Sequence, residues 1–355
     1  MGRVLRVLGT LAVLAALALL PLFERHPYPL HVGILLLLAV AQGSAWNVIG
    51  GYAGQYSVGH AAFFGLGGYV TMMLLEDGGI APWWGIWPAM GAAVLLALVV
   101  GSITFRLRGP YFVLASIAVA EIIRLAAVNW RSVTRGAEGI LLTGIPPLHL
   151  GGLTVKFIYK PPFYEAALGL AALTVGASWL VRHSKLGYYL QAIREDQDAA
   201  HSLGISLAFH KNAALAISAA FTAAAGGITA LYVRFIDPSI AFGLDVSVQM
   251  VLLAIIGGIG TTLGPVIGAL VLIPLSEALR NDLLGKWLVG SGLVREDSRL
   301  GHFLTENLSH AHVLVYGILV VVVILFAPDG ILGIARGAAA RLRRRLSRDR
   351  AGAEG

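Results

Sequence analysis

Long apolar runs separated by short polar stretches are the most regular feature of this sequence. Most of the runs approach the about 20 residues that a helix needs to cross the hydrocarbon core of a membrane. They lie at residues 4–22, 31–49, 60–75, 86–105, 110–129, 163–181, 211–233, 247–260, 264–280 and 311–327. A β-barrel would need alternating apolar and polar residues, whereas these runs are continuous. Since only helices and closed barrels satisfy the backbone in lipid, the pattern predicts an all-α polytopic membrane protein with about ten transmembrane helices.

The amino-acid composition supports this prediction. Hydrophobic residues make up 57% of the chain and charged residues only 13%, whereas an ordinary soluble domain is roughly 25% charged. A net charge of +7 is compatible with nucleic-acid binding, but seven arginines gather after the last apolar run. They are Arg336, Arg341, Arg343, Arg344, Arg345, Arg348 and Arg350. Such a cluster beside a membrane helix marks the cytoplasmic side, so the basic charge indicates topology and not a nucleic-acid partner.

The distribution of Lys and Arg also predicts the orientation of the helices. Basic residues are in excess at 106–108, at 182–211 and in the C-terminal tail, which the positive-inside rule assigns to the cytoplasm. We expect one transmembrane domain over residues 1–335 and a basic cytoplasmic tail over 336–355, with both termini in the cytoplasm. The first apolar run also has the character of a secretory signal peptide, but the many later spans favour a retained helix.

A glycine-rich stretch, GGYAGQYSVGHAAFFGLGG, occupies residues 50–68. Its polar residues are expensive if they face lipid. Two interpretations stay open: a broken or re-entrant element beside a translocation path, or tight helix packing alone. The candidate residues are Gly51, Gly54, Gln55, Ser57, Gly59 and His60. A metal site is not expected, because His60 has no His, Asp or Glu nearby at ligand spacing.

A second glycine-rich stretch, IGGIGTTLGPVIGAL, occupies residues 256–270, with Gly258 among its candidate site residues. The spacing of four residues places Gly260, Gly264 and Gly268 on one face if the segment is helical. Pro265 predicts a turn or kink after Gly264. No Lys-Ser or Lys-Thr follows the glycines, so this is not a phosphate loop. We expect a short cytoplasmic hairpin between two packed helices.

The apolar run at 110–129 contains a carboxylate and a guanidinium three residues apart, Glu121 and Arg124. This spacing places the two side chains on the same face of a helix. A carboxylate inside a membrane helix indicates a proton relay or a substrate contact. The alternative is a buried structural ion pair near the end of the helix.

Residues 182–211, RHSKLGYYLQAIREDQDAAHSLGISLAFHK, are too polar to span a membrane and too periodic for a plain loop. Leu186, Leu190, Ile193, Ala200 and Leu203 recur on one helical face, and Arg194, Glu195, Asp196 and Asp198 occupy the other. Gly204 supplies a left-handed C-terminal cap. We predict one or two cytoplasmic helices in which Ala199 and Ala200 expose a close-contact surface and the carboxylates meet basic groups of a partner. A solvated connecting helix is the alternative.

The segment from Asp198 to Gly204, DAAHSLG, resembles the EAA coupling loop of ATP-binding-cassette (ABC) importer permeases, with Asp in place of the usual Glu. Three further stretches support a family resemblance: GYAGQYSVGHAAFFGLGGY at 51–69, RGPYFVLASIAVAEIIRL at 108–125 and IIGGIGTTLGPVIGA at 255–269. Together they identify the chain as similar to the M-type permease subunits of branched-chain amino-acid (Leu/Ile/Val) importers. Tyr56 departs from the family pattern, in which Leu is common.

The resemblance implies a subunit of the bacterial inner (plasma) membrane. Its implied partners are a homologous second permease subunit, two ABC ATPase subunits and an extracytoplasmic solute-binding protein. It also implies that Arg194, Glu195, Asp198, Ala199, Ala200 and Gly204 dock on an ATPase. The chain itself is expected to hold no catalytic residue, metal or cofactor. Since it lacks a Walker A motif, ATP and Mg are expected on the ATPase subunits.

Other transport functions stay open on the sequence alone. Permeases for urea or short-chain amides are similar in sequence and differ in substrate. An ion-coupled secondary transporter would need Glu121 or His60 to titrate during transport. An intramembrane enzyme has less support, since neither a His-Glu-x-x-His nor a Gly-x-Ser-x-Gly pattern is present.

Overall fold

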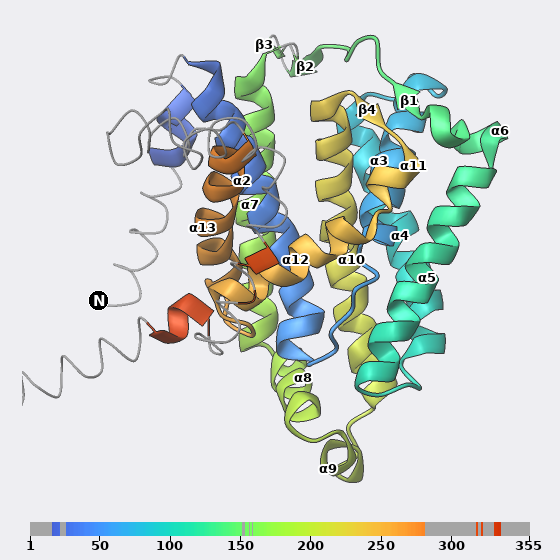
Figure 1. The fold of residues 1–355 in the computed structure, drawn as a ribbon, viewed down its shortest axis with the longest axis vertical. Helices are drawn as coiled ribbons and strands as arrows, with labels where there is room; N and C mark the ends of the chain where they lie inside the picture. Colours follow the sequence, from blue (N-terminus) through green and yellow to red (C-terminus); the bar gives the residue numbers. More distant parts are fainter. Residues whose placement is uncertain are drawn as a thin grey trace, which may run out of the picture. The chain divides into compact units, whose positions relative to one another are not determined.

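The computed structural model describes residues 16–21, 26–150, 153–155, 157, 159–280, 317–318, 321 and 330–334. The chain forms two compact units, Met1–Val251 and Leu252–Gly355. Most of the described residues are helical (Figure 1). The protein is therefore an all-α, multi-pass membrane protein in class, as the sequence predicts.

The long helices follow one another along the chain, and longer connections with short elements of their own separate α5 from α7 and α7 from α10 (Figure 1). They are α2 (Pro27–Asn47), α3 (Ala61–Glu76), α4 (Pro82–Thr104), α5 (Pro110–Asn129), α7 (Lys160–His183), α10 (Leu207–Val233), α12 (Leu244–Gly257) and α13 (Gly264–Arg280). Among the described residues, six helical segments are long and apolar enough to cross a membrane. Shorter elements are η1 (Val48–Tyr52), α6 (Arg131–Thr134), η2 (Gly136–Glu138), α8 (Lys185–Glu195), α9 (Gln197–Ser202) and α11 (Pro238–Ala241).

Four short strands complete the description. They are β1 (Ile140–Leu141), β2 (Leu148–Leu150), β3 (Leu153–Val155) and β4 (Phe235–Ile236). β1 pairs antiparallel with β4, and β2 pairs antiparallel with β3. The sequence pattern does not reveal these strands, because they are too short to show an alternating pattern.

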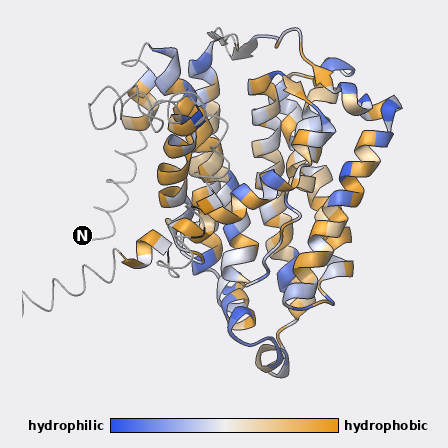
Figure 2. Ribbon diagram, viewed as in Figure 1, coloured by the Kyte–Doolittle hydropathy of each residue, from blue (hydrophilic) through white to orange (hydrophobic). Residues whose placement is uncertain are grey.

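Several helices begin at proline for a common physical reason. Pro27, Pro82 and Pro110 each stand in the first turn of α2, α4 and α5. Proline has no backbone N–H to leave unpaired there, and its fixed φ suits a helix. Figure 2 shows apolar residues along α4 and α5 and hydrophilic residues on α8. These three helices therefore begin where a proline meets the start of an apolar run.

The apolar runs between residues 31 and 280 each coincide with a helix of the structure. The largest shifts are at the N-terminal ends, where α2, α4 and α10 each begin four residues before the expected 31, 86 and 211. The runs at 4–22 and 311–327, and the basic tail, lie wholly or largely outside the described residues. The expected count of ten helices is thus untested at both ends of the chain.

The helix α10 is the centre of the first unit and packs against α2, α3, α4 and α7. Small residues permit close approach, because a Cβ at Gly67 of α3 would overlap the backbone of Ala223 on α10. Similarly, a Cβ at Gly226 would overlap the carbonyl of Phe64. In membranes, where apolar burial gives little driving force, such contact between backbones is a main source of helix association.

Candidate coupling and translocation site

The segment α8–α9 lies at the end of the first unit opposite the short strands (Figure 1). Each of its helices has a side-chain N-cap. The Ser184 hydroxyl accepts from the backbone N–H of Gly187, and the Asp196 carboxylate accepts from Asp198 N at 2.8 Å and Ala199 N at 3.0 Å. Gly204, at φ 84°, ends the segment in the left-handed conformation expected from the sequence. The polar stretch therefore forms two helices and not a plain loop.

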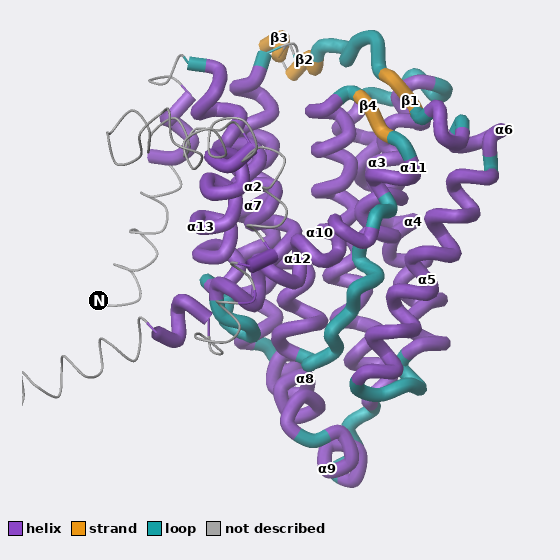
Figure 3. The backbone as a smooth tube through the Cα atoms, in the orientation of Figure 1, coloured by secondary structure: helices purple, strands orange, loops and turns teal. Residues whose placement is uncertain are grey.

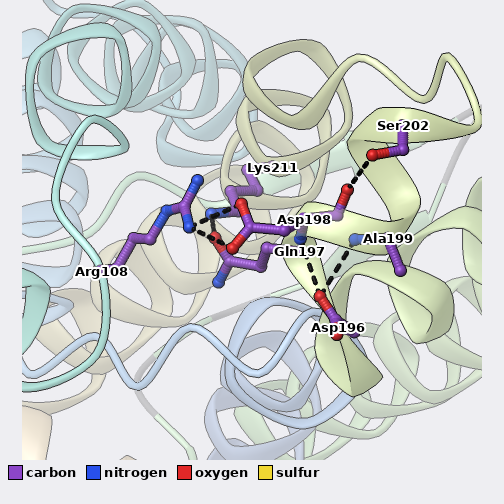
Figure 4. Close-up of polar contacts among 7 residues, drawn as sticks. All are labelled: Arg108, Asp196, Gln197, Asp198, Ala199, Ser202 and Lys211. Atoms are coloured by element: carbon purple, nitrogen blue, oxygen red, sulfur yellow. Dashed lines mark hydrogen bonds and ion pairs between the residues drawn. The ribbon is translucent and has the colours of Figure 1, made fainter.

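Asp198 and Gln197 tether α9 to neighbouring elements (Figure 4). Arg108, in the turn between α4 and α5, lies 2.8 Å from Asp198 Oδ1 through its Nη1. Lys211, buried at the start of α10, donates from Nζ to Gln197 Oε1 at 2.9 Å. The Arg108–Asp198 pair is well exposed, so its own contribution to stability is only about 0.2–1 kcal/mol. It orients α9 without locking it in place.

Arg194 connects α8 to the glycine-rich segment. Its Nη1 donates to the carbonyl oxygen of Gly51 at 2.7 Å. Gly54 stands beside it at φ 66°, where an added Cβ would come 3.0 Å from Arg194 Cγ. Leu190, one turn before Arg194 on the same helix, and Ile193 are completely buried. The helix is thus held against the membrane domain by both apolar packing and a charge-assisted hydrogen bond.

The segment after α2 is a broken helix (Figure 3). The helix widens into the π-helical η1, and residues 53–60 are non-helical before α3 begins. The indole Nε1 of Trp46 donates to Ser57 O at 2.6 Å, which satisfies one carbonyl that the broken helix leaves unpaired. Gln55 is buried, and its Nε2 donates to Ala53 O at 3.3 Å. The structure therefore confirms a broken element at this place.

His60 is completely buried in a hydrogen-bond chain of two serines. Its Nε2 lies 2.8 Å from Ser218 Oγ, and its Nδ1 lies 3.1 Å from Ser57 Oγ. Because the Ser218 hydroxyl donates to Ala45 O at 2.7 Å, Nε2 carries the proton and Nδ1 accepts from Ser57. Both ring nitrogens are thus occupied within the protein. Among the residues that the structure describes, no cluster of His, Asp and Glu is suited to a metal.

The broken element also contacts α5. The N–H of Val58 donates to Ser116 Oγ at 3.0 Å, and a Cβ at Gly59 would sit 2.5 Å from the carbonyl oxygen of Ser116. A cavity of about 10 Å³ lies between Ser57, Gly59, Ser116 and their apolar neighbours. That volume is close to the minimum for one water molecule. Gly59 is therefore required by close packing, not by backbone conformation.

Glu121 and Arg124 form the ion pair that their spacing predicts. Arg124 donates from Nε to Glu121 Oε2 at 2.8 Å and from Nη2 to Oε1 at 2.5 Å. The pair is not buried, since the side chains are 49% and 25% exposed. The expectation of a buried structural pair is wrong because α5 covers the first unit with its other face, which includes Phe112, Ser116 and Ala120.

The glycines at 257–268 divide between a turn and a helix. Gly258 and Gly260 have φ values of 127° and 72° in the connection between α12 and α13, and Gly264 begins α13. The expected common face of Gly260, Gly264 and Gly268 is therefore wrong, because the chain leaves helical geometry at Gly258. The expected turn or kink after Gly264 is wrong, because the turn lies at 258–263 and Pro265 stands in the first turn of α13. The expected hairpin between two helices is present. A Cβ at Gly268 would overlap the carbonyl of Leu253, so the two helices of this hairpin are closely packed.

Two details of the expected face on α8–α9 are wrong. Ala200 is buried at 3% exposure, whereas Leu203 is 82% exposed. Ala200 lies within α9, whereas Leu203 follows the last helical residue, Ser202, and so does not continue the buried face. Ala199, Arg194, Glu195 and Asp198 are exposed. Sequence reasoning also missed Arg108, Gln197 and Lys211, because contacts over such separations leave no local pattern.

Comparison with known proteins gives a consistent family assignment. Residues 30–324 match the family described as "Branched-chain amino acid transport system / permease component". The chain is 27% identical over 275 residues to the high-affinity branched-chain amino acid transport system permease protein LivM of Escherichia coli K12, covering 70% of this chain and 63% of that protein. It is 25% identical over 265 residues to LivH of the same strain, covering 67% of this chain and 80% of LivH. The match thus spans less than two thirds of the length of LivM.

A solved structure, PsaBC from Streptococcus pneumoniae in complex with Fab, is also similar. It has a TM-score of 0.44 and 14% sequence identity, and the match covers 89% of this chain and 97% of that one. These values are too low for any conclusion to rest on them.

Proposed function

Since the chain belongs to the family of permease components of branched-chain amino acid transport systems, we propose that it is the membrane-spanning subunit of an ABC importer for those amino acids. The observation that carries the proposal is the capped helix pair α8–α9, held at one end of the membrane helices by Arg108 and Arg194. A helix pair in this position is what an ATPase subunit needs as a docking surface. A solvated connecting loop would need neither caps nor tethers.

The proposed complex contains further subunits. A homologous second permease, two ATPase subunits and an extracytoplasmic solute-binding protein complete it. ATP and Mg bind to the ATPases, and this chain performs no covalent step. Both termini and α8–α9 lie in the cytoplasm in this arrangement, which agrees with the arginine-rich tail.

The proposed mechanism is alternating access. Closure of the ATPases on ATP moves α9 and α8, and their two tethers carry the motion into the membrane domain. The Arg108–Asp198 pair leads to the start of α5, and the Arg194–Gly51 hydrogen bond leads to the broken element. The free energy for this conformational change comes from contacts that differ between the two states of the complex.

The test is uptake of radiolabelled leucine by vesicles that contain the complete complex, with urea measured in parallel. We expect ATP-dependent leucine uptake that Gly204→Trp uncouples, so that ATP is hydrolysed with little transport. Gly79→Trp is the matched control. Gly79 also has a positive φ and no atom within 4 Å of its Cβ position, but it lies in the connection from the end of α3 to the start of α4.

Each result has a distinct meaning. Urea uptake without leucine uptake would support the proposal of an ABC importer but would show that its substrate is urea and not leucine. Uptake driven by protons without ATP would overturn the proposal in favour of a secondary transporter. Equal coupling in the two glycine variants would remove the docking role of α8–α9.

A further inference from the structure

The ion pair of Glu121 and Arg124 lies near the middle of a membrane helix. α5 has 20 residues and is therefore about 30 Å long, and Glu121, its twelfth residue, lies about 17 Å from the first. Arg124 points back toward Glu121 instead of extending toward the nearer end of the helix, as an arginine facing lipid would. The pair thus occupies the depth at which charge is most costly in lipid.

The neighbouring helix α4 shows what a lipid-facing surface of this protein looks like. α4 and α5 are equally exposed, with 22% of each span buried. The exposed side chains of α4 include Trp87, Leu95 and Ile103, and the whole helix contains no charged residue. α5 has the same exposure with two charges on it, which indicates that its outer face meets water or polar groups.

The contacts of α8–α9 converge on this same helix. Arg108, the partner of Asp198, stands two residues before the start of α5. The second tether, from Arg194 to Gly51, reaches the broken element, whose Val58 N–H donates to Ser116 on α5. A movement of the coupling helices therefore acts on α5 by two routes, and α5 is placed to change its exposed face during transport.

We propose that the outer face of α5 lines the translocation path and binds the zwitterionic head group of the substrate. Glu121 contacts the ammonium group, and Arg124 contacts the carboxylate. Opening the internal pair while forming these two contacts conserves charge pairing, so a zwitterion enters without leaving a charge unpaired. The proposal rests on the proposed function for the identity of the substrate.

Cysteine accessibility tests the surface directly, because the chain contains no cysteine. Ala118 is exposed on α5 one turn before Glu121, and Leu95 on α4 is 67% exposed. In the complete complex, a charged, membrane-impermeant methanethiosulfonate reagent should modify Ala118→Cys at least about ten-fold faster than Leu95→Cys. Saturating leucine with binding protein and ATP should slow the modification. Leu114→Cys, one turn earlier on the same face, repeats the test if Ala118→Cys does not assemble.

Two results would overturn the proposal. Equal and slow modification of both cysteines would mean that α5 faces lipid or a packed protein surface. Fast modification that leucine does not slow would mean that the face is wet but does not bind the substrate.

Substitution of the charges tests the ligand contact. Glu121→Gln and Arg124→Gln should each lower leucine uptake about ten-fold, the scale of a lost charge-assisted hydrogen bond, while ATP hydrolysis continues. Glu121→Asp, which keeps the charge, should recover part of the uptake. Normal uptake in both Gln variants would refute the contact. Absence of leucine uptake by the unaltered complex would instead refute the proposed function. The modification rate of Ala118→Cys would still show whether the outer face of α5 is accessible to water.

Discussion

Arg194 donates a hydrogen bond to the carbonyl oxygen of Gly51 at 2.7 Å, across 143 positions of the sequence. The carbonyl belongs to the π-helical turn that interrupts the end of α2, and the guanidinium belongs to the helix α8 outside the membrane helices. One side chain thus connects the polar helix pair α8–α9 with the irregular backbone inside the first unit. A movement of α8 is therefore expected to move the backbone at Gly51, and a movement at Gly51 to move α8.

Arg194→Ala should weaken the coupling of ATP hydrolysis to uptake. The change removes a charge-assisted hydrogen bond and leaves the Gly51 carbonyl with one partner fewer, a loss of about 1–3 kcal/mol. The ratio of ATP hydrolysed to leucine transported should rise at least several-fold. Arg106→Ala, at an exposed arginine of the α4–α5 turn, is the control and should leave the ratio unchanged. An unchanged ratio of ATP hydrolysed to leucine transported in Arg194→Ala would show that this hydrogen bond takes no part in coupling.

The role of Asp198 can be separated into an internal and an external part. Asp198→Arg should uncouple hydrolysis from uptake, because it places like charges beside Arg108. Adding Arg108→Asp restores the pair in reverse, and if the tether to α5 is what matters, coupling should recover. The coupling ratio of the single and double variants is the measurement. Failure of the double variant would mean that the carboxylate itself meets the ATPase.

The hydrogen bonds of His60 should stabilise the fold and not take part in proton transfer. Ser218→Ala removes the group that joins His60 to the Ala45 carbonyl and should lower the free energy of unfolding by about 1–3 kcal/mol. The Tm of the purified complex reports this change. Leucine uptake should be insensitive to a proton gradient in both the unaltered protein and the Ser218→Ala variant. Gradient-driven uptake that His60→Gln abolishes would contradict this prediction.

Gly59→Ala should damage assembly, because the added Cβ would overlap the carbonyl oxygen of Ser116. A methyl group at that distance forces the backbones of α5 and the broken element apart. Gly169→Ala is the matched control, since nothing lies within 4 Å of its Cβ position on α7. It should leave the Tm unchanged or raise it slightly, as removal of a helical glycine commonly does. Equal Tm values would show that the contact at Gly59 is not tight.

Much of the fold was accessible from local pattern. The apolar runs between residues 31 and 280 place the ends of the eight long helices to within about four residues, because a membrane helix is defined by its own hydrophobic length and internal hydrogen bonds. Gly204 and the break near Gly54 were also accessible, since both depend on backbone conformation that glycine alone adopts easily. The exposure of Leu203 was not, because α9 ends at Ser202 and the helical period does not reach Leu203.

The sequence by itself determined the class of protein, the order of its long helices and a polar helical segment after α7 that ends at Gly204. The tertiary structure decided which side chains meet: Asp198 with Arg108, Arg194 with Gly51, and His60 with Ser218. It also decided that Glu121 faces outward while Ala200 faces inward. Periodicity shows which residues share a face but not what that face meets, because the neighbour is chosen by packing among helices far apart in the chain.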